Sequence, residues 1–414
     1  MHICFISTYF PQPCGIASYV HYLIEALHSS DPSLQITLLA EKPAEENTSQ
    51  LFHVSGIFTR EGDYPNQILT EVKRISPDIV HIQHEYGIFG IDNRFFQLLR
   101  QIRDLGIRTV VTLHTVHTRL SFFAGCAAPY LRYLLRKVNI EEYQRRLGEL
   151  ADLVIVHQEN SIRQVLLRQG LSPDRVVTVP HGTRVLESIE ASQAKAALHL
   201  ESNTPLIMAF GYLEQSKNLL LLIEAFRQLK MHVPKAKLWL GGYVRFPTSQ
   251  TRAYWDRCLR LIETAALKDD IFFSDMLLPE EKVPQLLAAA DVACFVYNED
   301  TRSSSGALHL AMGLSKAVVA SRIPKFQELS EVSDEILVNP LSARELSHLL
   351  SRLLLDEQFH LYIRQRVASY AQRTAWPSVA QQHWTLYNQL LSVQHPATGY
   401  NLQSNNLEIT AMVT

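Results

Sequence analysis

The sequence predicts an α/β protein built from two doubly wound domains. The chain has 414 residues, and a length above roughly 250–300 residues exceeds what one hydrophobic core supports. Short apolar runs alternate with longer amphipathic segments along the chain, as in a parallel sheet covered by helices. The apolar runs are rich in Val, Ile and Leu and do not alternate with polar residues, as expected of strands buried on both faces.

Six apolar runs in the first half predict the strands of an N-terminal domain at residues 1–185. They are Ile3–Ser7, Ile36–Leu39, Ile79–Gln83, Thr109–Leu113, Leu153–Val156 and Val176–Val179. Helical spacing of apolar residues predicts helices between them, for example at Ile16–Leu27 and Phe95–Leu105. The first run lacks a preceding basic segment and is followed by Pro11 and Pro13, so we interpret it as a strand and not as a signal peptide.

A second series of runs predicts a C-terminal domain at residues 190–375. These runs are Leu206–Phe210, Lys237–Leu240, Ile271–Phe273, Val292–Val296, Ala317–Ala320 and Ile336–Val338, with helices at Leu219–Leu229, Val283–Ala289 and Ala343–Leu354. Strand signals lapse between Arg184 and Pro205, which marks the boundary. We expect residues 376–394 to form a helix that packs back on the first domain. The polar, aperiodic residues 395–414 predict a disordered tail.

Charge and composition argue against several classes of protein. The net charge of −2 gives no overall attraction to nucleic acid. No run reaches the roughly 20 apolar residues that span a bilayer, and the five scattered cysteines lack zinc spacing and fit a reducing compartment. We therefore expect a cytoplasmic protein, with peripheral contact at the inner face of the membrane left open. No metal-ligand, Walker or nucleophile motif is visible, so we expect neither a metal nor a resident cofactor.

A hydroxyl- and glycine-rich turn leads directly into a small-residue helix near Gly313. Its candidate ligand-binding residues are Ser304, Ser305, Gly306 and Ala307. Unpaired N–H groups at such a helix start, together with the helix dipole, suit an anion such as a diphosphate. The alternative is an ordinary N-cap made by Ser303 to Ser305, which many helices have.

Two further segments start helices after predicted strands. In the second domain, Gly211 and Tyr212 end a strand, and Lys217 precedes the helix that opens at Leu219. A lysine at a helix N-terminus opposes the dipole, so we favour a phosphate-binding lysine over a solvated one. Gly15 opens the first helix, where a phosphate site and a simple tight turn are equally good interpretations.

Histidines and one carboxylate follow strands of the first domain, where ligands of open α/β sheets bind. His84 and Glu85 follow the third strand, and Glu85 is a candidate acceptor-binding carboxylate, whereas a structural role is favoured for His84. His114 ends the fourth strand, so we expect its ring to point into the cleft. His181 lies in the Pro180–Thr183 turn at the domain junction and is a further candidate for acceptor binding.

Seven pieces in order resemble the large family of retaining GT-B glycosyltransferases that includes bacterial mannosyltransferases and sucrose synthases. They are Pro13–Val20, Asp78–His84, Val111–Thr115, Val179–Gly182, Gly211 with Lys217-Asn218, Ala290-Asp291, and Ser305-Gly306 with Ala311–Ser321. Each is weak alone, but their order and spacing are specific. The resemblance covers nearly the whole chain, from Met1 to about Leu391.

The resemblance implies two Rossmann-like domains that face a central cleft. A nucleotide-diphosphate sugar then binds mainly to the C-terminal domain, and the acceptor binds mainly to the N-terminal one. Gly15 would lie under the donor phosphate, His114 would contact the transferred sugar, and Lys217 would neutralise the leaving diphosphate. No metal is needed for that step, because Lys217 and the helix dipole supply the charge.

Two departures from the family pattern affect the same site. The family usually has Arg beside the glycine that matches Gly211, and here the residue is Tyr212. The family also has two glutamates separated by seven residues, and alignment puts Arg302 and Leu310 at those positions. We expect Arg302 to restore the lost cation, whereas Leu310 removes the usual partner of the ribose hydroxyls.

The leading interpretation is an enzyme that transfers a hexose to a glycan or lipid-linked acceptor, as in the synthesis of a cell-surface or secreted polysaccharide. The alternative is a catalytically silent subunit of the same fold that binds a glycan or a partner enzyme. A phosphatase, phosphorylase or epimerase keeps a small share, because fold does not fix function. The segment Phe122–Arg146 mixes aromatic and leucine side chains with Arg132, Arg136 and Lys137, which predicts either a membrane-surface helix or a helix with a solvated basic face.

Overall fold

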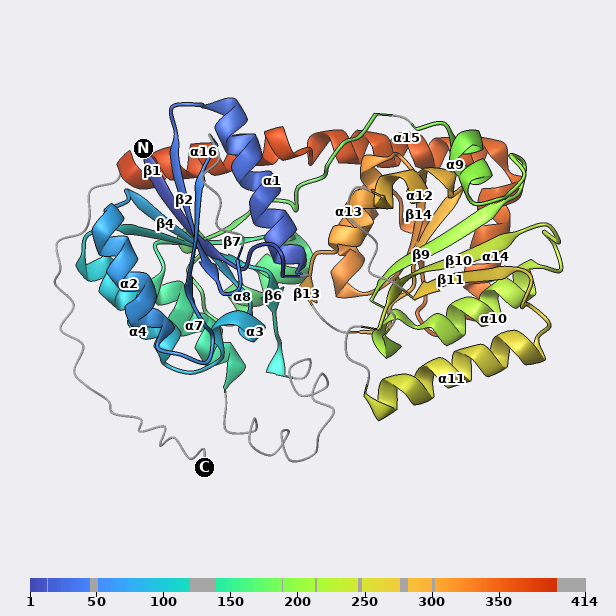
Figure 1. Ribbon diagram of the computed structural model, residues 1–414, viewed down its shortest axis with the longest axis horizontal. Helices are drawn as coiled ribbons and strands as arrows, with labels where there is room; N and C mark the ends of the chain where they lie inside the picture. The colour runs from blue at the N-terminus through green and yellow to red at the C-terminus, as the bar shows by residue number, and fades with distance from the viewer. Residues whose placement is uncertain are drawn as a thin grey trace.

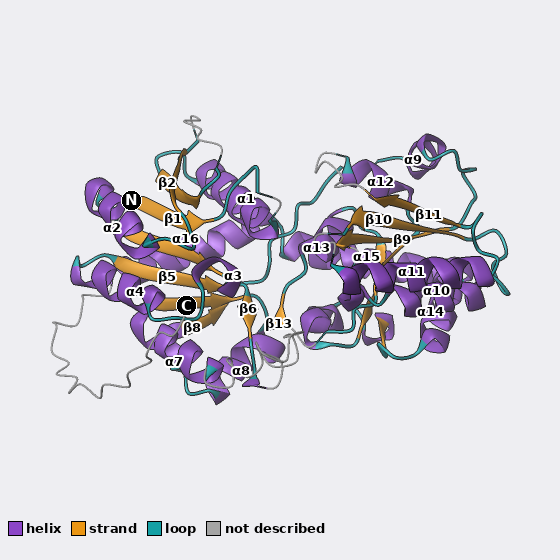
Figure 2. Cartoon of the chain, turned by 60° about the horizontal axis from the view of Figure 1, so that its bottom comes forward, coloured by secondary structure: helices purple, strands orange, loops and turns teal. Residues whose placement is uncertain are grey.

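The computed structural model describes residues 1–12, 14–44, 51–119, 139–187, 189–212, 214–244, 248–275, 282–299 and 302–392. Two lobes lie side by side, each with a twisted parallel sheet between layers of helices (Figures 1 and 2). The predicted tail at 395–414 lies outside the described residues, as does the basic stretch with Arg132, Arg136 and Lys137. No helix in the described part of the chain is both long and apolar enough to span a bilayer.

The N-terminal sheet has seven parallel strands in the order β3-β2-β1-β4-β5-β7-β8. Their bounds are β1 His2–Ser7, β2 Gln35–Glu41, β3 His53–Phe58, β4 Ile79–His84, β5 Arg108–Leu113, β7 Leu153–Val156 and β8 Val176–Thr178. The sequence did not predict β3, because it lies at the edge of the sheet. Only alternate residues of β3 are buried, so it lacks the continuous apolar run of the central strands.

The C-terminal sheet has six parallel strands in the order β11-β10-β9-β12-β14-β15. Their bounds are β9 Leu206–Tyr212, β10 Lys237–Tyr243, β11 Ile271–Asp275, β12 Val292–Phe295, β14 Ala317–Ser321 and β15 Leu337–Val338. In both sheets the strand order reverses beside the first strand of the lobe, which is the arrangement of a doubly wound fold. The predicted fold class of two doubly wound α/β sheets is confirmed.

Helices cover both faces of each sheet. In the N-terminal lobe, side chains of α1 and α16 share a buried cluster with one face of the sheet, and α2, α4 and α7 cover the other face. In the C-terminal lobe, Figure 1 shows α10, α11 and α14 on one side and α12, α13 and α15 on the other. The helices are α1 Gly15–Ser30, α2 Tyr64–Ile75, α3 Tyr86–Phe89, α4 Arg94–Asp104, α7 Ile140–Leu150, α8 Gln164–Arg168, α9 Ala191–Ala197, α10 Leu219–Leu229, α11 Ser249–Thr264, α12 Val283–Ala289, α13 Gly306–Gly313, α14 Ala343–Leu355, α15 Glu357–Arg373 and α16 Trp376–Ser392.

Among the described residues, a pair of helices and a small sheet link the lobes in addition to the chain between β8 and α9. Helix α15 covers the C-terminal lobe and α16 continues onto the N-terminal lobe, where it packs against α1 (Figure 1). A two-stranded antiparallel sheet pairs β6 (Thr115–Val116) with β13 (Arg302–Ser303). This small sheet joins the segment after β5 to the turn before α13, so it fixes one side of the space between the lobes.

Candidate active site

A cavity of about 510 Å³ lies between the two lobes, where the carboxyl ends of their strands face each other. From the N-terminal lobe it is lined by one face of α1 and by the turn after β8. From the C-terminal lobe it is lined by the carboxyl ends of β9 and β10, by the segments after β9, β12 and β14 and by the start of α13. The predicted site residues that line it are Gly15, His181, Gly211, Tyr212, Lys217, Ser304, Ser305, Gly306 and Ala307.

The start of α13 presents backbone N–H groups to this cavity. The Ser305 side chain caps the helix by accepting a hydrogen bond of 3.3 Å from the Leu308 N–H. The Oγ of Ser304 is buried, lines the cavity and has no hydrogen-bond partner among the described residues. Because a helix N-terminus carries partial positive charge, this turn suits an anion that could also accept a bond from Ser304.

Lys217 provides a cation beside that turn. The short 3-10 helix Gln215–Lys217 follows β9, and Asn218 then turns the chain with a φ of 53°. The Lys217 ammonium lies 3.7 Å from the centroid of the Tyr297 ring. Burial lowers the pKa of Lys217, although the Glu299 and Glu214 carboxylates act in the opposite direction. A bound anion at this position would therefore stabilise the charged form of the lysine.

Glycines leave room for a ligand at two places. A Cβ built on Gly15 would meet no protein atom within 4 Å, so the space in front of α1 is open. At the end of β9, Gly211 has a φ of +129°, which favours glycine. A Cβ on the neighbouring Gly242 would lie 1.7 Å from the Gly211 carbonyl oxygen, so no other residue fits at position 242 without a shift of the backbone.

Lys325 is a cavity-lining cation that the sequence analysis missed. It lies in the 3-10 helix Pro324–Glu331, and its Nζ is 2.9 Å from Glu299 Oε1 and donates a 2.7 Å hydrogen bond to Ser303 Oγ. Its position four residues after β14 is the signal that could have found it, since ligands of such sheets collect at the carboxyl ends of strands.

Arg302 does not lie where the sequence analysis expected it. We expected a cation at a helix start that faces the phosphates. Arg302 instead belongs to β13, where it pairs with Val116 of the other lobe, and it is absent from the residues that line the cavity. Pairing across the lobes depends on residues far apart in the sequence, so the local pattern around the helix start could not reveal it.

His114 is buried and is not among the residues that line the cavity, so the expectation that its ring points into the cleft stays a prediction. Its Nε2 lies 2.9 Å from Gln83 Oε1 and its Nδ1 lies 3.4 Å from His157 Nε2. Burial and the neighbouring His157 hold the pKa of His114 well below its ordinary value. The ring packs edge-on against Tyr19, with centroids 4.8 Å apart, and Tyr19 does line the cavity.

The other candidate acceptor residues fall into two groups. His181 lines the cavity and stacks on His309, with ring centroids 4.5 Å apart, and burial holds its pKa well below the ordinary value. His84 is buried against aromatic rings, and this burial lowers its pKa to about 3. Glu85 accepts a 2.7 Å hydrogen bond from Thr115 Oγ1, and burial raises its pKa. Neither His84 nor Glu85 lines the cavity.

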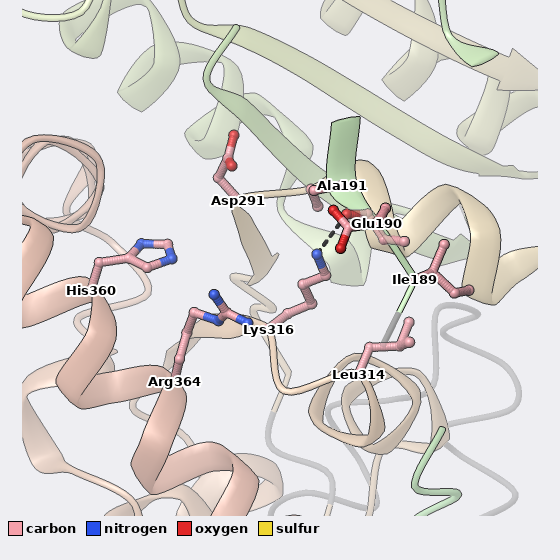
Figure 3. Close-up of a pocket in the computed structure, with 10 residues that line it drawn as sticks. Ile189, Glu190, Ala191, Asp291, Leu314, Lys316, His360 and Arg364 are labelled. Carbon is pink, nitrogen blue, oxygen red and sulfur yellow. Dashed lines mark hydrogen bonds between the residues drawn. The ribbon is translucent and has the colours of Figure 1, made fainter. Parts of the chain in front are cut away.

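A second cavity, of about 230 Å³, lies beside α15 (Figure 3). Lys316 Nζ donates a 2.6 Å hydrogen bond to the Ala288 carbonyl, and Arg364 Nε donates to the Ser315 carbonyl. These cations therefore bind carbonyls at the ends of α12 and α13. Asp291 and Lys316 directly precede β12 and β14, so this cavity lies at the amino ends of the strands. The cavity between the lobes is the better candidate site, because ligands bind at the carboxyl ends.

The described residues contain no group of three or more His, Cys, Asp or Glu side chains placed to hold a metal ion. The groups in the cavity lining that can bind an anion are cations, hydroxyls and the N-terminus of α13. They suit a phosphate-bearing ligand.

Comparisons with known proteins agree with this geometry. Residues 13–185 match the family model of glycosyltransferase family 4, and residues 204–356 match that of the group 1 glycosyl transferases. Together the two matches cover most of the chain. A D-inositol 3-phosphate glycosyltransferase from Corynebacterium aurimucosum is 24% identical over 338 residues, which are 77% of this chain and 73% of that protein.

Solved structures show the same fold. The sucrose-phosphate synthase of Thermosynechococcus elongatus superposes with a TM-score of 0.71 at 20% identity, covering 94% of this chain and 99% of that one. HepE of Anabaena in complex with UDP-glucose gives a TM-score of 0.67 at 18% identity, covering 94% and 100%. The chain therefore belongs to the group 1 and family 4 glycosyltransferases, retaining enzymes of the GT-B fold that transfer a sugar from a nucleotide sugar.

Proposed function

We propose that this protein transfers a hexose from a nucleotide-diphosphate hexose to a glycan or a lipid-linked acceptor. The observation that carries the proposal is the convergence of Lys217 and the start of α13 on one cavity, which is also lined by Ser304, whose hydroxyl has no hydrogen-bond partner among the described residues. These groups match a diphosphate in charge and in hydrogen-bonding capacity.

The same groups account for the chemical step. When the bond from the sugar to the diphosphate breaks, negative charge grows on the leaving phosphate. The Lys217 ammonium and the N–H groups of Gly306 and Ala307 are donors that are already in place for this charge, and such preorganised donors lower the barrier. The open space in front of Gly15 gives the phosphates room against the N-terminal lobe.

The acceptor binds, in this proposal, on the N-terminal side of the cavity. One face of α1 and His181 line that side. The contact of His114 with the transferred sugar stays a prediction. Its ring packs edge-on against Tyr19, which lines the cavity, so a contact through Tyr19 supports a role for His114 near the acceptor side.

The choice of a first donor follows from the comparisons. HepE has been crystallised with UDP and with UDP-glucose, so UDP-hexoses head the panel of donors, followed by GDP- and ADP-hexoses. The relative from Corynebacterium acts, by its name, on a phosphorylated inositol. A soluble phosphorylated polyol is therefore tested beside a lipid-linked acceptor.

The experiment incubates the protein with each nucleotide sugar, with and without acceptors, and measures release of the nucleoside diphosphate. Release that an acceptor accelerates, with the anomeric configuration of the donor kept in the product, supports the proposal. Tight binding without turnover on any acceptor would favour the silent binding subunit instead, which Leu310 in the cavity lining motivates. Failure of all nucleotides and nucleotide sugars to bind would contradict the proposal.

A further inference from the structure

The cavity contains two lysines that share one carboxylate. Lys325 forms an ion pair with Glu299, with 2.9 Å between Nζ and Oε1. The same carboxylate acts on Lys217 and raises its pKa against the effect of burial. All three side chains line the cavity. Glu214 also lines the cavity and acts on Lys217 in the same direction, so Glu299 is the carboxylate that the two lysines share.

We propose that Lys325 is the second diphosphate-binding cation of this enzyme, and that it exchanges Glu299 for the phosphates of the donor. This inference rests on the proposed function, because it concerns the same diphosphate site. The family usually has a phosphate-binding arginine where this chain has Tyr212. Arg302 lies in β13 and is absent from the cavity lining, so the proposal assigns this positive charge to Lys325.

The position of Lys325 is fixed from both lobes. Its backbone carbonyl accepts a 2.8 Å hydrogen bond from Gln158 Nε2 of the N-terminal lobe. Its ammonium donates to Ser303, which pairs with Thr115 of the N-terminal lobe in the β6–β13 sheet. Lys325 therefore sits where the lobes meet, in contact with Ser303, the residue that directly precedes Ser304. A cation in this place is preorganised for the phosphates on the turn before α13.

The exchange follows from the charges of the possible partners. A diphosphate carries more negative charge than a single carboxylate, and lysine is a compact charge on a flexible chain. Glu299 then acts as a competitor that holds Lys325 in place and lowers the affinity for the donor. Removal of Lys325 and removal of the Glu299 charge must therefore change the affinity for a diphosphate in opposite directions.

A purely structural ion pair makes a different prediction. If Lys325 and Glu299 only stabilise the fold, both substitutions lower the melting temperature, and neither improves nucleotide binding. Whether Glu299→Gln strengthens diphosphate binding therefore distinguishes a ligand-binding role of Lys325 from a purely structural one, whatever the loss of stability.

The experiment measures binding by calorimetry for the diphosphate among UDP, GDP and ADP that binds most tightly, with its monophosphate as comparison. We expect Lys325→Met to weaken the diphosphate about tenfold or more and the monophosphate less. Glu299→Gln should tighten the diphosphate, and this gain should shrink in the Lys325→Met background. Lys325→Arg should keep most of the affinity. Lys268→Met, which removes an exposed lysine of the same lobe, is the matched control and should change nothing.

Unchanged diphosphate affinity in Lys325→Met, in a protein where Lys217→Ala weakens binding, would overturn this inference and leave the proposed function standing. Weaker binding in both Lys325→Met and Glu299→Gln would overturn it as well. If the unmodified protein binds none of the three diphosphates, the proposed function fails and the role of Lys325 fails with it.

Discussion

The ammonium of Lys217 lies 3.7 Å above the ring of Tyr297. A cation over an aromatic face gains roughly 0.5–2 kcal/mol, which holds the lysine in place without neutralising its charge. Burial lowers the pKa of this lysine. A negatively charged ligand would raise that pKa again, because it stabilises the ammonium form. The pair therefore describes a cation that is positioned in advance for a phosphate.

Neighbouring serines at the start of α13 should separate capping from ligand binding. Ser305 caps the helix through Leu308, so Ser305→Ala should lower the free energy of unfolding by about 1 kcal/mol. The buried hydroxyl of Ser304 has no partner in the part of the chain that the structure describes, so Ser304→Ala should leave stability nearly unchanged and weaken nucleotide-diphosphate binding. Chemical denaturation and calorimetry on both variants check this. If Ser304→Ala instead lowered stability and Ser305→Ala weakened nucleotide binding, the interpretation of this turn would be refuted.

His114→Ala should lower turnover while nucleotide affinity stays nearly intact. The substitution removes the ring that packs against Tyr19 and takes from Gln83 Oε1 its His114 partner, while Gln83 Nε2 keeps its contact with His81. We expect a stability loss of about 1–3 kcal/mol and a fall in turnover of up to roughly 100-fold, the cost of a small misplacement in an active site. Steady-state kinetics and nucleotide titration measure the two effects separately. An equal loss of nucleotide affinity would place His114 at the phosphates instead.

Lys316 should make stability depend on pH. Burial and the charge of Arg364 lower the pKa of Lys316 to about 8, whereas an unfolded lysine titrates near ~10.4. Between these values the unfolded chain holds a proton that the folded chain has lost, so this residue's contribution to stability rises with pH across that window. Below about pH 8 the buried Lys316 is charged in the folded protein, so the full free-energy cost of burying its charge reduces stability.

The variant Lys316→Met removes this cost together with the bond to the Ala288 carbonyl. It should exceed the parent in free energy of unfolding by ~1–3 kcal/mol at pH 7, and the difference should shrink as pH rises above about 8. Denaturation curves from pH 7 to pH 10 measure it, with Lys268→Met as an exposed control. A difference that does not vary with pH would show that Lys316 is charged in the fold throughout this range.

The basic stretch before α7 predicts a salt-sensitive attachment to anionic membranes. Each Lys or Arg near such a surface contributes about 1 kcal/mol, so changing Arg132, Arg136 and Lys137 together to Ser should abolish sedimentation with anionic vesicles at low salt. The alternative is a helix with a solvated basic face. If the unmodified protein does not sediment with the vesicles, a soluble acceptor becomes the better interpretation.

The sequence predicted most of the fold, because buried parallel strands leave continuous apolar runs that need no knowledge of their neighbours. It also indicated the turn before α13 and the segment around Lys217, since both combine a strand end with a helix start. The structure brings these two segments together in one cavity.

Three features were beyond the sequence pattern for a common reason. Arg302 pairs with Val116 and is absent from the cavity lining, Lys325 contacts Glu299 across 25 intervening residues, and His114 contacts Gln83 and His157. Each depends on a contact between segments far apart in the sequence. Local periodicity and strand-end position carry no information about such contacts.

The central claim is that the cavity between the lobes binds a nucleoside diphosphate through Lys217 and the start of α13. The most direct test is a calorimetric titration of UDP, GDP and ADP into the unmodified protein and into Lys217→Ala. We predict that at least one diphosphate binds and that Lys217→Ala weakens it by about 1.5–3 kcal/mol, the worth of a hydrogen bond to a charged group. Equal affinity in the two proteins, or no binding of any diphosphate to the unmodified one, would contradict the account.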